Sequence, residues 1–363
     1  MLLLCCLCFT QICPAYAESD PIETLLNEAL QEADDIHIPE FNFQETTKQL
    51  ISGNFSLRLS DILSAASNMI FKEVKEHLSL LIKMLVLSIL AGILCNLVQS
   101  SPESGTGEIA FLACFTLIAG LSVTIVSGLA ELAADTIDTL MIFIASLMPI
   151  LGGLITSLNP AVLSGFYPTL FLAMQTFVTI CHQCFLPMIT VMTALSVVNA
   201  MSGRFHITRL IEFTGQAVKW GLGILLTIFV GILGIHGFSV FAAGSVAGRT
   251  VKYALCNFVP IVGGVLSESI EAVISSLRLI RSSVGIAGAL GLISLCALPL
   301  IKLLTVSFLY RFAAGIAEPA TDKRIVRLLM DLAGNITLIF AILLMVSVMF
   351  IISISLLCSI FTR

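Results

Sequence analysis

Long apolar runs recur through most of the chain and constrain its fold more than any other feature. Stretches near or above the ~20 residues that an α-helix needs to cross a bilayer recur from Leu78 to Phe361. Hydrophobic residues make up 58% of the chain and charged residues 11%, whereas soluble domains are about 45–50% apolar and about 25% charged. The sequence therefore predicts an all-α, polytopic helical membrane protein. The expected spans are 78–98, 109–130, 137–158, 166–200, 220–241, 284–310 and 336–361.

The first 77 residues have a different character. Residues 1–17 read as a signal peptide, because an apolar stretch ends in the A-x-A cleavage pattern Ala15-Tyr16-Ala17 and acidic residues follow. Residues 18–77 form an exported region in which apolar residues recur at helical spacing on both sides of Pro39. We expect these amphipathic helices to lie on the membrane surface, on a partner, or against the protein's own bundle.

Three blocks of sequence occur twice and in the same order. Residues 148–154 match 259–265, residues 184–189 match 296–301, and residues 207–211 match 325–329. Because the offsets are nearly constant, the chain is predicted to contain an internal duplication. The predicted organisation is a first transmembrane helix and loop at 78–108, membrane repeat 1 at 109–219, membrane repeat 2 at 220–335, and a last transmembrane helix at 336–363.

Basic residues predict the orientation of the two repeats. Arg204, Arg209 and Lys219 are expected in one loop between spans, and a second basic loop follows residue 310. Both loops are expected to be cytoplasmic, since cytoplasmic loops carry an excess of Lys and Arg. The chain then crosses the membrane an even number of times between them, and the repeats are parallel. If the Pro-Gly-Gly segment of the second copy also crosses, the repeats are inverted. The residues of the second basic loop are Arg311, Lys323, Arg324 and Arg327.

Proline and glycine interrupt equivalent positions of the two predicted repeats. Such breaks in two repeats mark a binding site or pathway in many transporters, and the alternative is a kink with only a packing role. Lys302 lies inside its span, where a lysine is costly and often functional, unless its ammonium reaches an interface. The candidate pathway or hinge residues are Pro149, Gly152, Gly153, Pro260, Gly263, Gly264, Pro187, Pro299 and Lys302.

Other polar groups carry a weaker signal. Asp135 and Asp138 are three residues apart and are expected on the solvated face of a loop between two spans. Cys181 and Cys184 flank His182 and are expected to share a helical face, but ordinary packing is favoured because no second pair of ligands follows. We expect no enzymatic activity, no cofactor, no metal site and no nucleic-acid partner, since the chain has neither a catalytic motif nor a basic run.

The chain resembles the stage III sporulation protein AE family of endospore-forming bacteria along its length. The resemblance is carried by the leader ending at Ala17, the short exported region, the blocks at 148–154 and 259–265, and the turn at 318–324. It implies a multi-pass protein of the mother-cell membrane that surrounds the forespore. It also implies a channel or secretion-like complex with other stage III sporulation A membrane proteins and a forespore-side channel protein.

Three functions follow as hypotheses. The leading one is a non-enzymatic integral membrane subunit of that complex, required for endospore formation. The first alternative is a self-sufficient permease for a small solute, which the paired breaks favour. The second alternative is a structural membrane scaffold that contains no conduit.

Overall fold

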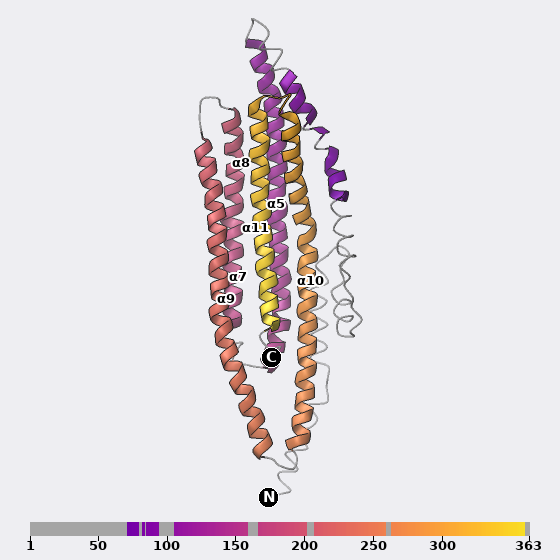
Figure 1. Cartoon of the computed structure of the whole chain (residues 1–363), viewed down its shortest axis with the longest axis vertical. Helices are drawn as coiled ribbons and strands as arrows, with labels where there is room; N and C mark the ends of the chain where they lie inside the picture. The colour runs from indigo at the N-terminus through magenta and orange to yellow at the C-terminus, as the bar shows by residue number, and fades with distance from the viewer. Residues whose placement is uncertain are drawn as a thin grey trace.

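The structure is a bundle of long helices. The computed structural model describes residues 71–79, 82–83, 85–93, 105–158, 166–201, 207–258 and 263–359, and no strand occurs among them. The prediction of an all-α fold is confirmed. The predicted signal peptide, residues 18–70 and Pro260 lie outside the described residues. The named elements are α5 (Gly105–Leu158), α7 (Phe166–Ile180), the π-helix η2 (Cys181–Phe185), α8 (Leu186–Met201), α9 (Thr208–Phe258), α10 (Gly263–Ala317) and α11 (Lys323–Ser359) (Figure 1).

Five helices of the described chain are long and apolar enough to cross a membrane, which confirms the prediction of a multi-pass membrane protein. The two spans expected at 109–130 and 137–158 are wrong, because both belong to the single 54-residue helix α5. The intervening sequence Glu131–Thr136 contains neither proline nor glycine, and acidic residues alone do not end a helix. The five candidate spans are Leu112–Pro149, Tyr167–Met201, Thr208–Gly234, Val284–Ala317 and Lys323–Ser355.

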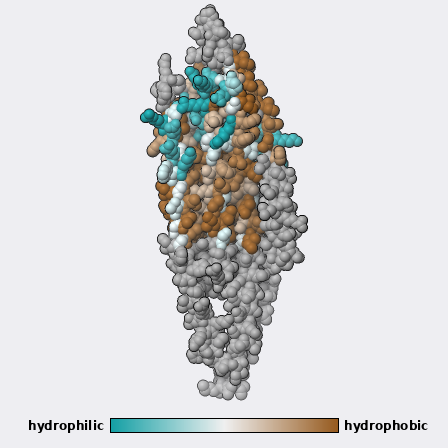
Figure 2. All heavy atoms as spheres, viewed as in Figure 1, coloured by the Kyte–Doolittle hydropathy of each residue, from teal (hydrophilic) through white to brown (hydrophobic). Residues whose placement is uncertain are grey.

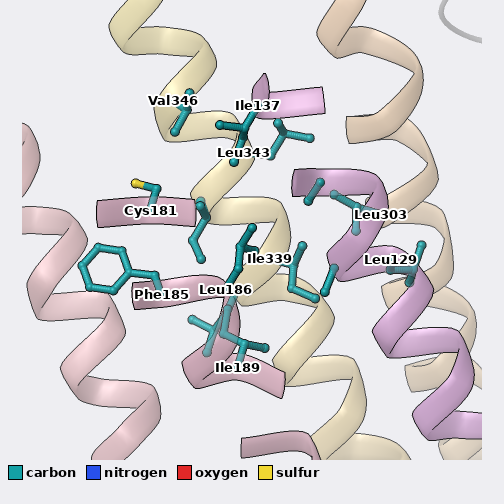
Figure 3. Packing of buried hydrophobic residues seen from close by; sticks show 14 of the residues in the cluster. Leu129, Ile137, Cys181, Phe185, Leu186, Ile189, Leu303, Ile339, Leu343 and Val346 are labelled. Atoms are coloured by element: carbon teal, nitrogen blue, oxygen red, sulfur yellow. The ribbon is translucent and has the colours of Figure 1, made fainter. Parts of the chain in front are cut away.

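Helix α11 occupies the centre of the bundle. It contacts α5, α7, α8, α9 and α10, and 61% of an apolar 18-residue stretch of its candidate span is buried. Ile339 and Leu343 of α11 lie between apolar side chains of the surrounding helices, including Ile137 of α5 and Leu186 of α8 (Figure 3). From Ile336 onward α11 carries no charged side chain, and a helix segment that is apolar on every side is suited to such a central position.

Hydrogen bonds between side chains hold α11 against two neighbours. Asn335 donates from Nδ2 to Thr193 Oγ1 of α8 at 3.1 Å, in a buried position. Ser307 of α10 donates to the Ala333 carbonyl at 3.1 Å, and Ser347 donates to Cys296 Sγ at 2.9 Å. Because lipid offers no alternative partners, hydrogen bonds of this kind help to fix which faces of membrane helices meet.

Small residues allow α10 to approach α5 closely. A Cβ atom placed on Gly291 would lie 2.8 Å from Phe143 Cζ, and one placed on Gly288 would lie 2.9 Å from Leu147 Cδ1. Phe143 and Leu147 are both fully buried on α5. The two glycines therefore form the surface that receives the apolar face of α5, as small residues do between other membrane helices.

The two basic turns lie at the same end of the bundle. Arg327 at the start of α11 donates from Nη2 to Thr208 Oγ1 at the start of α9, at 2.7 Å. Helix α9 runs away from this end and α10 returns to it, with residues 259–262 between them (Figure 1). The parallel interpretation of the repeats requires this arrangement, whereas inverted repeats would place the basic turns at opposite ends. The duplication itself stays a prediction.

Among the described residues, the basic side chains assigned to these turns lie on helices rather than in long loops, which corrects the sequence-based expectation; they are Arg209, Lys219, Arg311, Lys323, Arg324 and Arg327. Helix α10 extends to Ala317, Pro319 follows its end, and α11 begins at Lys323. Asp322 caps α11, because its Oδ1 accepts the Arg324 N–H at 2.8 Å. In the view of Figure 2, hydrophilic residues gather at the upper left, toward this end of the molecule, and hydrophobic residues cover the middle and the upper right.

Replacement of Gly291 by leucine should destabilise the bundle. The new side chain would overlap Phe143 in a filled core, and overpacking of this kind costs about 1–3 kcal/mol. The measurement is the thermal unfolding midpoint of the purified protein in detergent. Gly234→Leu on α9 is the matched control, since nothing lies within 4 Å of its added Cβ. An equal midpoint for both variants would contradict the described α5–α10 packing.

Single cysteines at positions 209 and 324 of a cysteine-free chain should react from the same side of the membrane. Both positions flank the basic turns that the Arg327–Thr208 hydrogen bond holds together. The measurement is labelling by a membrane-impermeant thiol reagent on intact and on opened cells. We expect protection of both positions until the cells are opened, because both turns are predicted to be cytoplasmic. Labelling of only one position on intact cells would refute the described fold.

Candidate functional site

Three acidic residues interrupt the apolar sequence of α5. Glu131, Asp135 and Asp138 recur at helical spacing and are exposed on the described chain. Residues 109–130 before them and 139–158 after them contain no charged side chain. The hydroxyls of Thr136 and Thr139 donate to carbonyls of the preceding turn, at 2.6 and 2.8 Å, so these two polar groups are satisfied within the helix. The acidic residues therefore form an isolated ionisable row on an otherwise apolar helix.

A π-helix places His182 opposite this row. Pro187 lacks a backbone N–H and its ring would crowd the carbonyl of Gln183 in a regular α-helix. The turn just before this proline is a π-turn, which contains one more residue than an α-helical turn. The Leu186 N–H therefore donates to the Cys181 carbonyl, five residues earlier. His182 is the only His, Asp, Glu, Lys or Arg in the candidate span Tyr167–Met201 and lies near its middle. Isolated π-helical turns occur frequently at functional sites.

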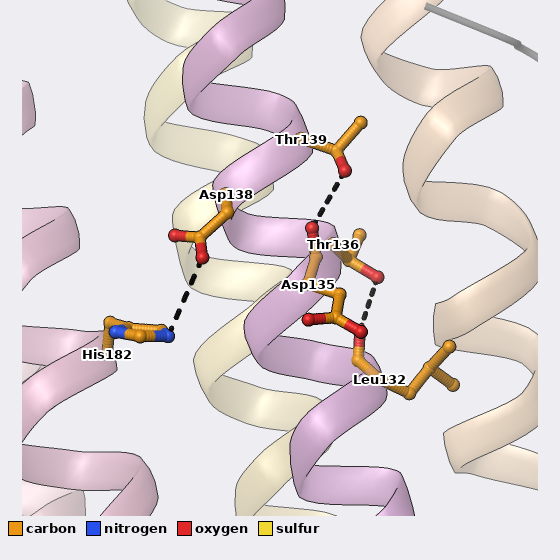
Figure 4. Close-up of polar contacts among 6 residues, drawn as sticks. All are labelled: Leu132, Asp135, Thr136, Asp138, Thr139 and His182. Atoms are coloured by element: carbon orange, nitrogen blue, oxygen red, sulfur yellow. Dashed lines mark hydrogen bonds and ion pairs between the residues drawn. The ribbon is translucent and has the colours of Figure 1, made fainter.

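Asp138 and His182 face one another across α5 and η2. The distance from His182 Nε2 to Asp138 Oδ2 is 3.8 Å, which is an ion pair when the imidazole is protonated (Figure 4). The side chains are 37% and 59% exposed for His182 and Asp138, respectively. His182 lies inside the candidate span Tyr167–Met201, and ionisable groups inside membrane spans are rare and usually functional. We call Asp138 and His182 the polar pair.

The Pro-Gly-Gly segment of the first repeat does not break its helix, contrary to the expectation. Pro149 is exposed on α5, and the helix continues through Gly152 and Gly153 to Leu158. Gly152 is buried, and a Cβ on it would lie 3.3 Å from Tyr167 Cε2 of α7. The missing side chain therefore lets α7 return closely against α5. In the second repeat, Gly263 and Gly264 are the first residues of α10.

The remaining candidates lie elsewhere in the bundle. Pro299 and Lys302 are half-buried on α10, which continues through Pro299 without a π-helix. Leu147, two residues before Pro149, contacts Gly288, and Lys302 is about 20 Å further along α10 at 1.5 Å per residue. The structure therefore does not bring Pro149 and Lys302 into one site. Pro187 is exposed and adjoins η2.

Neither residue of the polar pair is predicted as functional from the sequence. From the sequence, Asp138 is expected on a solvated loop and His182 is expected to be a packing residue. The absence of a helix breaker between Ala130 and Ile137 is the signal that would have kept Asp138 on a helix. Cys181 is buried and Cys184 is exposed, so these thiols do not share a face as expected, because the wider π-turn separates them. No group of potential metal ligands forms among the described residues.

Comparison with known sequences gives the family. The family Stage III sporulation protein AE matches residues 41–360. The chain belongs to this family. Stage III sporulation protein AE of Bacillus subtilis (strain 168) is 28% identical over 342 residues, which cover 94% of this chain and 85% of that protein. No solved structure matches the chain. Family membership supports a role in sporulation.

The polar pair should show weak but measurable coupling in the isolated protein. Half-exposed ion pairs contribute about 0.2–1 kcal/mol, so Asp138→Asn and His182→Gln should each cost little. The two changes should be non-additive in the thermal stability of the detergent-solubilised protein at mildly acidic pH, since the ion pair needs a protonated imidazole. Asp135→Asn combined with His182→Gln is the control and should be additive. Additivity in both cycles would mean that the pair does not form.

Proposed function

We propose that the chain is an integral membrane subunit of a channel or secretion-like complex that links mother cell and forespore during endospore formation. Membership in the stage III sporulation protein AE family supports the sporulation role. The five apolar helices support a multi-pass location in the membrane. We propose the mother-cell membrane around the forespore as that location, which the family resemblance implies.

The exposure of the polar pair is the observation that supports membership of a complex. Ionisable side chains inside membrane spans almost always face a bundle interior, a water-filled cavity or a charged partner. Asp138 and His182 are instead 59% and 37% exposed on the single chain, and Glu131 and Asp135 lie exposed on the same helix. A single chain surrounded by lipid would leave these groups in contact with acyl chains. A second subunit that covers them, or an aqueous path between subunits, removes that cost.

The proposed partners are inferred from the family resemblance and not from the polar pair. We propose other stage III sporulation A membrane proteins as neighbours within the mother-cell membrane. A forespore-side channel protein would meet the exported region 18–77 across the intermembrane space. No catalytic step is proposed for the chain, and its contribution is to complete a membrane assembly.

Removal of either member of the polar pair should reduce sporulation more than it reduces stability. Loss of one interfacial contact worth about 1.4 kcal/mol weakens the affinity of a complex tenfold, which lowers its occupancy tenfold where the subunits are below saturation. We expect Asp138→Asn or His182→Gln, introduced at the native locus, to lower the titre of heat-resistant spores about tenfold. The protein level, measured by immunoblot, should stay unchanged.

The matched control for this experiment is Glu318→Gln. Glu318 is an exposed acid in the turn between α10 and α11, outside the candidate spans. Its replacement should leave the spore titre at the wild-type value. Wild-type titres for both Asp138→Asn and His182→Gln would contradict the role of the pair, whereas normal spore yield after deletion of the whole gene would contradict the proposed function itself.

A further inference from the structure

The outer face of α9 contains an open groove that the proposed function does not use. Its volume is about 470 Å³, and it is lined by Lys219, Trp220, Gly223, Ile224, Thr227 and Ile228. Gly223 forms the floor, since nothing lies within 4 Å of the position of its missing Cβ. The Thr227 hydroxyl donates to the Gly223 carbonyl at 2.8 Å, so the floor offers no free side-chain donor. The groove is therefore apolar apart from its end at Lys219.

Charge and aromatic character change sharply along the groove. Lys219 is exposed at one end, and Trp220 beside it is 72% exposed. From Trp220 to Gly234, α9 carries no charged residue. Tryptophan is enriched where a membrane helix passes from head groups into acyl chains, and a lysine at that level extends its ammonium toward the head groups. The groove thus presents a cation at head-group level and an apolar channel below it.

We propose that this groove binds an anionic phospholipid. The phosphate of the head group pairs with the Lys219 ammonium, the glycerol region lies against Trp220, and one acyl chain lies over Gly223 between Ile224 and Ile228. Basic residues at the cytoplasmic surface attract anionic lipids, and the neighbouring turns of this end are basic as well. The inference is independent of the proposed complex, since it concerns lipid contact with one chain.

The dimensions of the groove favour a lipid over a second transmembrane helix. Lys219 to Ile228 covers about 14 Å along α9, whereas a helix that crosses the hydrocarbon core spans about 30 Å. A helix packed there would also cover the Lys219 ammonium. Only 28% of an apolar 18-residue stretch of the candidate span Thr208–Gly234 is buried, the lowest value among the five spans of the described chain, so much of α9 is open to lipid.

The test measures phospholipid retained by the purified full-length protein. The protein is reconstituted separately into vesicles of phosphatidylglycerol and of phosphatidylcholine, re-extracted in mild detergent, and analysed by native mass spectrometry. We expect retention of phosphatidylglycerol to exceed that of phosphatidylcholine about fivefold, the effect of one basic residue near an anionic head group. Lys219→Gln should abolish this preference, and Gly223→Leu should reduce retention of both lipids by filling the groove.

Matched controls keep the test decisive. Lys83→Gln removes an exposed lysine that precedes α5, and Gly234→Leu adds the same side chain to α9 beyond the groove. Both should retain the wild-type preference. An unchanged preference in Lys219→Gln would overturn the proposal, and this variant suffices if Gly223→Leu does not fold. Disulfide-linked dimers formed in membranes by Gly223→Cys in a cysteine-free chain would also overturn it, because a second copy would then occupy the groove.

Discussion

The burial of α11 is the constraint on which the rest of the bundle depends. Lipid is as apolar as leucine, so membrane helices associate through close packing and hydrogen bonds rather than through hydrophobic transfer. Helix α11 supplies both kinds of contact. Ile339 and Leu343 fill the centre (Figure 3), while Asn335 and Ser347 form hydrogen bonds to α8 and α10. With α11 in this position, α5 and α10 meet through small and aromatic residues on one side. The other helices therefore take their places around a single central element.

A filled centre also decides where polar chemistry is found. A permease built from broken helices places its substrate site between the repeats, near the middle of the membrane. In the described bundle that position holds apolar side chains of α11, and the first Pro-Gly-Gly segment continues as helix. The Asp138–His182 pair lies instead on the partly exposed surface of α5 and η2. This arrangement favours a polar contact or path between subunits over one through the chain.

The sequence predicted the helical membrane class and the common end of the two basic turns, because apolar length and charge bias act locally. It predicted the limits of the helices poorly. Glu131–Asp138 looked like a loop because charges are expected outside lipid, yet nothing there disrupts backbone hydrogen bonds. Residues 323–335 looked like part of a loop for the same reason, yet they begin α11. The polar pair depends on the packing of two distant segments and on a π-turn, which no local pattern reports.

The two halves of the predicted duplication differ in what their matching segments do. Cys184 and Cys296 match in sequence, yet Cys184 is exposed and Cys296 is buried against Ser347. At the same offset of 112 residues, His182 corresponds to Ser294, which cannot carry a charge. The proline of the first copy follows a π-helix, whereas that of the second lies in a continuous α-helix. In the second predicted copy this segment therefore packs against α11, whereas in the first it places an ionisable group on the partly exposed surface.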